Sequence, residues 1–181
     1  KDFVFVHPSA DVPAVVAALV RGAFEYQGQK CSAASRAYIP KSLWTKVSDQ
    51  LLSETRSLTM GDVRDFRNFV NAVIDESSFK SIAGYLEFAK NSTDAEVLVG
   101  GKTHGEKGYF VEPTIIQAKI PQFKTMVEEI FGPVLTIYVY EDRDLDEALK
   151  LCDETSPYSL TGAVFAQDRN AIIEMSQKLR N

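Results

Sequence analysis

Short runs of β-branched and aromatic residues alternate along the chain with longer segments in which apolar residues recur at helical spacing. The runs that predict strands are residues 2–7, 35–40, 95–101, 134–140 and 160–167. The segments that predict helices are residues 9–24, 42–58, 76–91, 142–156 and 168–180. Residues 108–117 look extended but are broken by Pro113, and residues 60–75 follow neither pattern.

This alternation predicts an α/β fold with three layers, in which helices flank a mostly parallel sheet. The helix over residues 9–24 is expected to be capped by Ser9 or Asp11, with Pro13 in its first turn. Beyond the cap, Arg21 is its single charge, so we expect it to be buried on most sides.

Size and composition fit one globular domain, since the chain has 181 residues, of which 45% are hydrophobic and 25% charged. The formal net charge of −5 argues against binding to nucleic acid or to an anionic membrane surface. Two cysteines are too few for a disulfide framework, and the two histidines lack the spacing of metal ligands. We therefore expect no metal site, no nucleic-acid partner and no membrane partner.

Both ends of the sequence suggest a fragment. It starts at Lys1 without a methionine, and it ends at Asn181 directly after a predicted helix. We expect residues 1–181 to be a single domain that is part of a larger one.

Cys31 lies in a loop of Gln, Gly, Lys and Ser between a predicted helix and a predicted strand. A thiol becomes a strong nucleophile as the thiolate, and the charge of Lys30 would favour that form. Gly28 permits a tight turn with room for a substrate, and Ser32 adds a hydroxyl group. On these residues alone, a partly buried structural cysteine in a turn stays an open alternative.

Two segments resemble the aldehyde dehydrogenases. "GQKCSAASR" at residues 28–36 is similar to their G-Q-x-C nucleophile motif, and "EEIFGPVLTIYVY" at residues 128–140 is similar to their E-I-F-G-P-V motif. The second follows the first by about a hundred residues, as it does in that family. "AFEYQGQKCSAASRAYIPKSLW" and "GYFVEPTI" further resemble the group that oxidises glutamate γ-semialdehyde, the Δ1-pyrroline-5-carboxylate dehydrogenases.

The resemblance implies an NAD-dependent enzyme of proline catabolism that forms glutamate through a cysteine thiohemiacetal and thioester. Cys31 matches the nucleophile, Glu129 the carboxylate that holds the nicotinamide ribose, and Phe131 an aromatic residue near nicotinamide and substrate. Ser32 resembles the serine that binds the substrate carboxylate, and Lys30 would assist by its charge. The implied partners are a small-molecule substrate and, in a homo-oligomer, further copies of the enzyme.

The resemblance also implies that residues 1–181 form a partial catalytic domain. The family's general base precedes a Gly-Gly-Lys whose lysine matches Lys1, and its NAD-binding domain lies further upstream. We expect this chain alone to be inactive. The implied location is the cytoplasm in bacteria and the mitochondrial matrix in eukaryotes.

Three other functions stay open. One is a dehydrogenase for a different aldehyde or semialdehyde. Another is a cysteine hydrolase, which would need a histidine to activate the thiol, although neither His7 nor His104 is placed for this by sequence. The last is a catalytically silent assembly module.

Overall fold

The structure is a computed structural model that describes residues 1–158 and 160–180. The strands are β1 Asp2–Val6, β2 Ala34–Pro40, β3 Ala95–Val99, β4 Thr103–His104, β5 Phe110–Val111, β6 Thr114–Ala118, β7 Val134–Tyr140 and β8 Gly162–Phe165. The α-helices are α1 Val12–Phe24, α2 Lys41–Ser57, α3 Glu76–Lys90, α4 Lys124–Val127, α5 Leu145–Glu154 and α6 Arg169–Lys178. The 3₁₀ segments are η1 Glu25–Gly28 and η2 Asp142–Asp144.

One six-stranded sheet organises the chain, with the strand order β3-β6-β7-β2-β1-β8. All neighbouring pairs are parallel except β3–β6 at one edge, which is antiparallel. The expected mostly parallel sheet is therefore confirmed. The sequence patterns did not predict the small β4–β5 hairpin or the single turn of α4, which are too short to show a periodicity.

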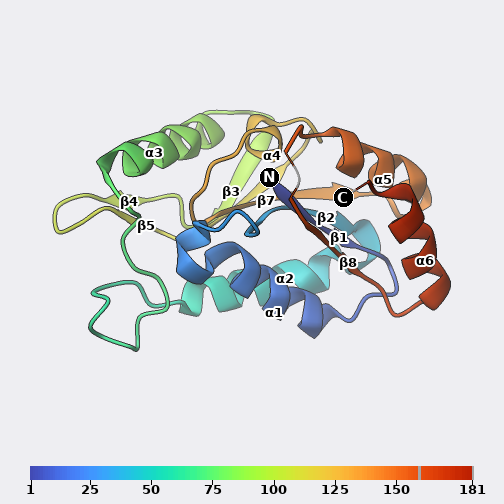
Figure 1. Ribbon diagram of the computed structural model, residues 1–181, viewed down its shortest axis with the longest axis horizontal. Coiled ribbons are helices and arrows are strands. Elements are labelled where there is room, and N and C mark those ends of the chain that lie inside the picture. Colours follow the sequence, from blue (N-terminus) through green and yellow to red (C-terminus); the bar gives the residue numbers. More distant parts are fainter. Residues whose placement is uncertain (159, 181) are drawn as a thin grey trace.

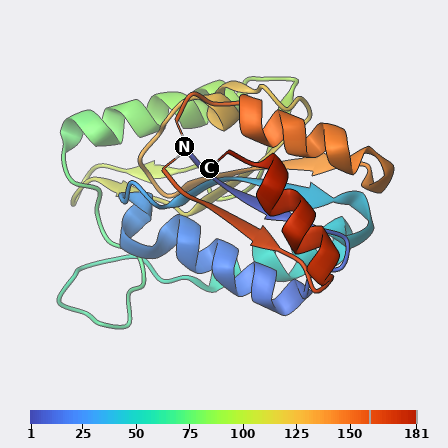
Figure 2. The ribbon, with the colours of Figure 1, turned by 45° about the vertical axis from the view of Figure 1, so that its right-hand side comes forward.

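Helices cover both faces of the sheet, as the three-layer prediction requires. α1 and α2 lie against one face, and α3 and α5 lie against the other (Figures 1 and 2). The alternating side chains of β1 show why both faces are apolar: Phe3 and Phe5 enter the core beneath α3, α5 and α6, whereas Val4 and Val6 enter the core beneath α1 and α2. Buried parallel strands need apolar residues on both sides.

α1 is buried on one side only, so the expectation of burial on most sides was wrong. Val16 and Leu19 are fully buried, whereas Ala14 and Ala17 face solvent. An exposed alanine costs little because its side chain is small. The burial expected from the apolar composition of this helix was therefore too high. Asp11 is the cap, because its carboxylate accepts from the Ala14 backbone N–H at 3.1 Å.

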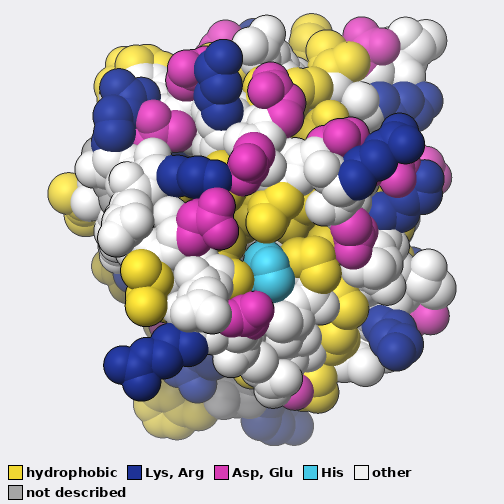
Figure 3. All heavy atoms as spheres, turned by 90° about the vertical axis from the view of Figure 1, so that its right-hand side faces the viewer, with side chains coloured by type: hydrophobic (Ala, Val, Ile, Leu, Met, Phe, Trp, Pro, Cys, Tyr) yellow, Lys and Arg dark blue, Asp and Glu magenta, His cyan; other side chains and the backbone are white. Residues whose placement is uncertain are grey.

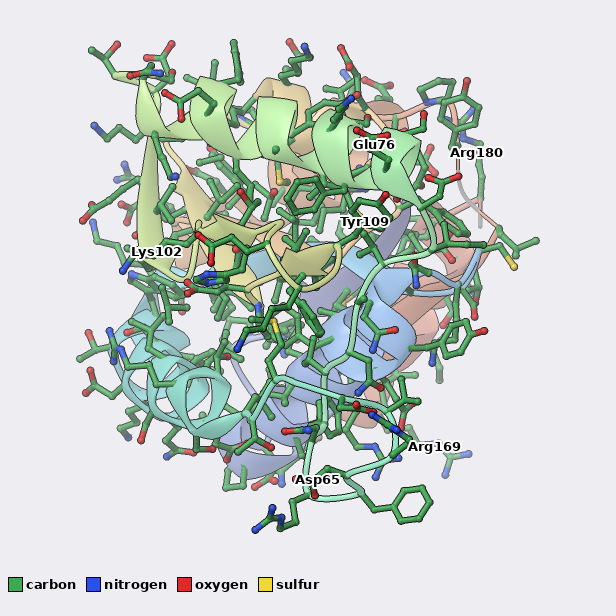
Figure 4. The ribbon with its side chains drawn as sticks, turned by 90° about the vertical axis from the view of Figure 1, so that its left-hand side faces the viewer. Asp65, Glu76, Lys102, Tyr109, Arg169 and Arg180 are labelled. Carbon is green, nitrogen blue, oxygen red and sulfur yellow. The ribbon has the colours of Figure 1, made fainter. Side chains whose placement is uncertain are left out.

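Residues 59–75 form an irregular loop, as expected, and Asp65 lies at its tip, away from α3 (Figure 4). Two hydrogen bonds at its base, from the Gly61 and Val70 amides, join the two arms of the loop to each other. On the side of α6, basic and acidic side chains are interspersed and do not gather into a patch of one sign (Figure 3). No helix within residues 1–158 and 160–180 is long and apolar enough to span a membrane.

Candidate active site

The amino ends of four neighbouring strands meet at one cleft. β7, β2, β1 and β8 are adjacent and parallel, so the residues just before each of them come together at one edge of the sheet. The cleft has a volume of about 710 Å³ and is lined by Lys1, Cys31, Glu128, Glu129, Phe131, Pro157, Tyr158 and Leu160. Segments that are up to about 160 positions apart thus form one site, because the parallel topology aligns their strands.

Cys31 is exposed at this cleft, in the middle of a tight turn. The Ala33 amide donates to the Lys30 carbonyl at 3.0 Å, which leaves Cys31 and Ser32 as the two central residues. The thiol is therefore accessible to a reactant. A structural cysteine would instead resemble Cys152, which is fully buried in α5.

The chain before Cys31 follows an unusual path. Tyr26, Gln27 and Gly28 have φ angles of 55°, 57° and 64°, so three consecutive residues adopt the left-handed conformation. A Cβ on Gly28 would lie 2.2 Å from the carbonyl oxygen of Gly132. The space that Gly28 leaves open is thus filled by Gly132, and not by a substrate as the sequence suggested. This contact fixes the Cys31 loop against the turn that carries Phe131.

Glu129 and Phe131 lie on that turn. Oε2 of Glu129 lies 2.5 Å from the backbone nitrogen of Lys1, and its side chain stays 33% exposed. Phe131 is 43% exposed and has a φ angle of 57°. An exposed aromatic residue in a left-handed conformation is uncommon, and such strain is found most often at functional sites. The structure therefore brings Cys31, Glu129 and Phe131 into a single cleft.

Lys30 and Ser32 flank Cys31 but do not line the same cleft. The Lys30 ammonium donates to Glu25 Oε2 at 3.2 Å, and Arg21 donates to the other oxygen of that carboxylate. These two hydrogen bonds, from Lys30 first and then Arg21, lower the pKa of Glu25. Ser32 borders a smaller hollow between α1, β1 and β8. The substrate-binding roles of Lys30 and Ser32 remain predictions.

A buried layer of polar groups supports the cleft from below. Arg36 is fully buried and donates from Nε to the Lys1 carbonyl at 3.1 Å and from Nη1 to the Cys152 carbonyl at 3.0 Å. The amine of Lys1 is also buried and has no hydrogen-bond partner among the described residues. Burial lowers the pKa of Lys1 to about 7, against the opposing effect of Glu129 and with a smaller lowering by Arg36.

Sequence reasoning missed Tyr158 and Leu160, whose exposed side chains form one wall of the cleft. Both precede β8, just as Cys31 precedes β2, so their position in front of a strand was the available signal. Asp2 holds this wall in place, because its Oδ1 accepts from the backbone amides of Leu160 and Thr161 at 2.9 and 3.2 Å.

The remaining candidate groups take no part in the cleft. His7 is hydrogen-bonded to Ser9 and His104 to Glu112, and neither histidine is among the described residues that line the site. Within the described part of the chain, no three His, Cys, Asp or Glu side chains are grouped to hold a metal ion. Burial raises the pKa of the Cys152 thiol to about 12, so that thiol is unreactive near neutral pH.

Comparisons with known proteins show which family the chain belongs to. Over its whole length, the chain is 59% identical to the mitochondrial delta-1-pyrroline-5-carboxylate dehydrogenase of Dictyostelium discoideum and 51% identical to that of Homo sapiens. It spans 32% of the length of each of these two relatives.

Among solved structures, the chain is similar to the delta-pyrroline-5-carboxylate dehydrogenase of Mycobacterium tuberculosis bound with NAD. The TM-score is 0.93 at 42% identity, over 99% of this chain and 32% of that one. The profile of the aldehyde dehydrogenase family matches residues 1–181. The chain therefore belongs to the aldehyde dehydrogenase family.

Proposed function

We propose that this chain is the nucleophile-bearing part of a longer enzyme that oxidises L-glutamate γ-semialdehyde to L-glutamate with NAD, in proline catabolism. The observation that carries the proposal is the shared cleft of Cys31, Glu129 and Phe131. The names of the relatives support the choice of substrate. Because the chain spans about a third of those relatives, we assign the activity to the longer enzyme and expect the 181 residues alone to lack it.

Cys31 supplies the covalent step. Its thiolate attacks the aldehyde carbon, and the carbonyl π electrons move to oxygen, giving a thiohemiacetal. When that oxyanion collapses, the C–H bond breaks and its electron pair leaves as hydride, so the carbon becomes a thioester. Water then cleaves the C–S bond to release the acid and regenerate the thiol. An exposed cysteine at the turn is suited to this route because both the aldehyde and the water must reach it.

The lining residues fit the nicotinamide end of NAD, which accepts the hydride when it is bound. Glu129 is partly exposed, and a carboxylate can accept hydrogen bonds from both hydroxyl groups of a ribose. Phe131 and Tyr158 offer exposed aromatic surface to a planar ring. We propose that Glu129 holds the ribose and that Phe131 packs beside nicotinamide and substrate.

Ser32 is the proposed donor to the substrate carboxylate, since it follows Cys31 in the same turn and is exposed. For Lys30 the proposal is weaker, because Glu25 already accepts from its ammonium. A full-length enzyme with Ser32 should prefer glutamate semialdehyde over uncharged aliphatic aldehydes, and kcat/KM for the two classes tests this. Equal kcat/KM values would instead favour a dehydrogenase of other aldehydes.

The decisive experiment replaces Cys31 with alanine in a full-length enzyme and measures both NADH formation and NAD⁺ binding. We expect NADH formation to fall by at least about 10³-fold while NAD⁺ binding persists, since the thiol makes the bond to the substrate but holds no cofactor. Cys152→Ala, at the buried thiol, is the matched control and should retain turnover. Unchanged NADH formation in Cys31→Ala would refute the proposal.

Two rival functions predict different results. A cysteine hydrolase would cleave activated esters and oxidise no aldehyde, but a thiol of that class requires a nearby histidine. Both histidines are engaged elsewhere, with Ser9 and Glu112. A silent assembly module would leave Cys31 no more reactive toward iodoacetamide than a free thiol.

The location and assembly follow from the same proposal. The Dictyostelium and human relatives are named mitochondrial, and we propose the mitochondrial matrix for a eukaryotic enzyme and the cytoplasm for a bacterial one. We also propose that the full-length enzyme is a homo-oligomer, which its molar mass in solution tests.

A further inference from the structure

Glu128 is a second acidic residue in the cleft, and it is held by a helix from outside the two sequence motifs. The hydroxyl of Tyr85, on α3, donates to Glu128 Oε2 at 2.8 Å. Burial, together with the hydrogen bond and charge of Glu128, raises the pKa of Tyr85 to about 12. Tyr85 therefore keeps its proton at neutral pH and acts as the donor. This contact fixes the Glu128 carboxylate at the rim of the cleft.

The backbone that carries Glu128 is also fixed. The Ser156 hydroxyl donates to the Val127 carbonyl at 2.9 Å and accepts from the Tyr158 amide at 3.2 Å. One serine thus joins the acidic wall of the cleft to the wall that contains Tyr158. Glu128 itself is extended, with φ −85° and ψ 144°, and Glu129 follows it directly. Both carboxylates line the cleft from adjacent positions.

One basic side chain lies near Glu128. Among the described residues, the cation nearest to it is Lys124, whose Nζ lies 4.0 Å from Oε2. That ammonium also lies over the rings of Tyr85 and Phe88, at 5.1 and 5.2 Å from their centroids, and is 43% exposed. Glu128 therefore places a second carboxylate at the mouth of the cleft, next to Glu129, and the Lys124 ammonium near it also lies over two aromatic rings.

We propose that Glu128, positioned by Tyr85, selects the oxidised form of the nicotinamide cofactor. This inference rests on the proposed function, in which Glu129 holds the adjacent ribose. The nicotinamide ring carries a positive charge in NAD⁺ and none in NADH, while the ribose is the same in both. A neighbouring carboxylate attracts the charged ring and leaves the neutral ring unaffected. Such selection favours binding of the reactant and release of the product.

The test is equilibrium binding of NAD⁺ and of NADH to a full-length enzyme, without aldehyde. For Glu128→Gln, we expect NAD⁺ to bind about two- to fivefold more weakly and NADH to change by less than about 1.5-fold, since a half-exposed charge acts through screening water. Glu128→Lys should weaken NAD⁺ binding further, because it replaces the negative charge with a positive one. Tyr85→Phe should give a smaller shift in the same direction, because it frees the carboxylate without removing it.

Two further variants separate this role from others. Glu129→Gln should weaken the binding of both NAD⁺ and NADH, because the ribose is common to them. Glu96→Gln removes an exposed carboxylate on β3 and should leave the binding of both NAD⁺ and NADH unchanged. An unchanged ratio of NAD⁺ to NADH affinity in both Glu128→Gln and Glu128→Lys would overturn the inference while leaving the proposed function intact. If the unmodified enzyme bound neither form of the cofactor, both proposals would fail.

Discussion

Gly28 lies directly against Gly132, so closely that a Cβ on Gly28 would stand 2.2 Å from the Gly132 carbonyl oxygen. The two glycines belong to the two motifs that resemble the aldehyde dehydrogenases, about a hundred residues apart in sequence. Their contact sets the position of Cys31 relative to Glu129 and Phe131. Each of these glycines thus allows the two motifs to pack closely against each other, and neither supplies a reactive group.

In a full-length enzyme, Gly28→Ala is expected to damage both stability and turnover. The left-handed backbone at φ +64° costs an alanine about 1–2 kcal/mol, and the overlap with Gly132 adds to that cost. Because relief requires the two turns to move apart, kcat/KM should fall beyond what the loss of folded enzyme explains. Thermal unfolding and steady-state kinetics on the same sample measure the two effects.

Gly84→Ala is the matched control for that variant. Gly84 lies in α3, and a Cβ there meets no atom within 4 Å. An alanine at this exposed helical position should raise the unfolding free energy by about 0.5–1 kcal/mol and leave kcat/KM unchanged. If both variants behaved alike, the contact between Gly28 and Gly132 would have no special role.

The two thiols should differ sharply in alkylation. Cys31 is exposed, whereas Cys152 is buried and its pKa is raised to about 12. Iodoacetamide at neutral pH should therefore label the peptide that contains Cys31 and spare the one that contains Cys152, because the thiolate is the reacting form. Peptide mass spectrometry before and after unfolding in urea checks this. Labelling of Cys152 in the folded protein at a similar rate would contradict the assigned burial.

Lys1→Met should stabilise the fold at neutral pH and remove a pH dependence. The folded-state pKa of Lys1 is lowered to about 7 from 10.5, so between these values the unfolded chain binds more protons than the folded one. The free energy of unfolding therefore rises with pH in this window, by up to about 1.4 kcal/mol per pH unit. Below about pH 7 the amine is protonated in both states, so the full destabilisation by the buried charge is present there. Urea unfolding at a series of pH values measures the slope.

In Lys1→Met that slope should flatten, because methionine fills a similar volume without a charge. Lys102→Met, at an exposed lysine beside the β4–β5 hairpin (Figure 4), should leave the slope of stability against pH unchanged. A slope of equal size in the Lys1→Met protein would show that other groups cause it.

In a full-length enzyme, Ser32→Ala and Lys30→Ala should have unequal effects on KM for the substrate. Loss of the Ser32 hydroxyl should raise KM for glutamate semialdehyde by about tenfold, as expected for one hydrogen bond to a charged group, and leave propanal unaffected. Lys30→Ala should change KM by less than about twofold, because Glu25 already accepts from its ammonium at 3.2 Å. Steady-state kinetics with both aldehydes provide the measurement, and the reverse order of effects would reassign the carboxylate to Lys30.

The sequence by itself predicted the main helices and strands and suggested the chemistry. Apolar runs with strand and helix periods specified the layers, because each element must bury its apolar side. The residues around Cys31 and Glu129 gave the proposed reactive groups, because their type and order resemble the motifs of the aldehyde dehydrogenases.

Only the tertiary structure decided which of these groups share a cleft. Tyr158 and Leu160 join it because β8 pairs with β1, and Tyr85 reaches Glu128 from α3, which packs against β3 and β5. Lys30 turns to Glu25, and α1 leaves Ala14 and Ala17 in water. Each of these outcomes depends on the sheet order and on how far a side chain reaches. The periodicity of the sequence gives neither the sheet order nor the reach of a side chain. It shows which side of a helix or strand is apolar, but not which other element packs against that side.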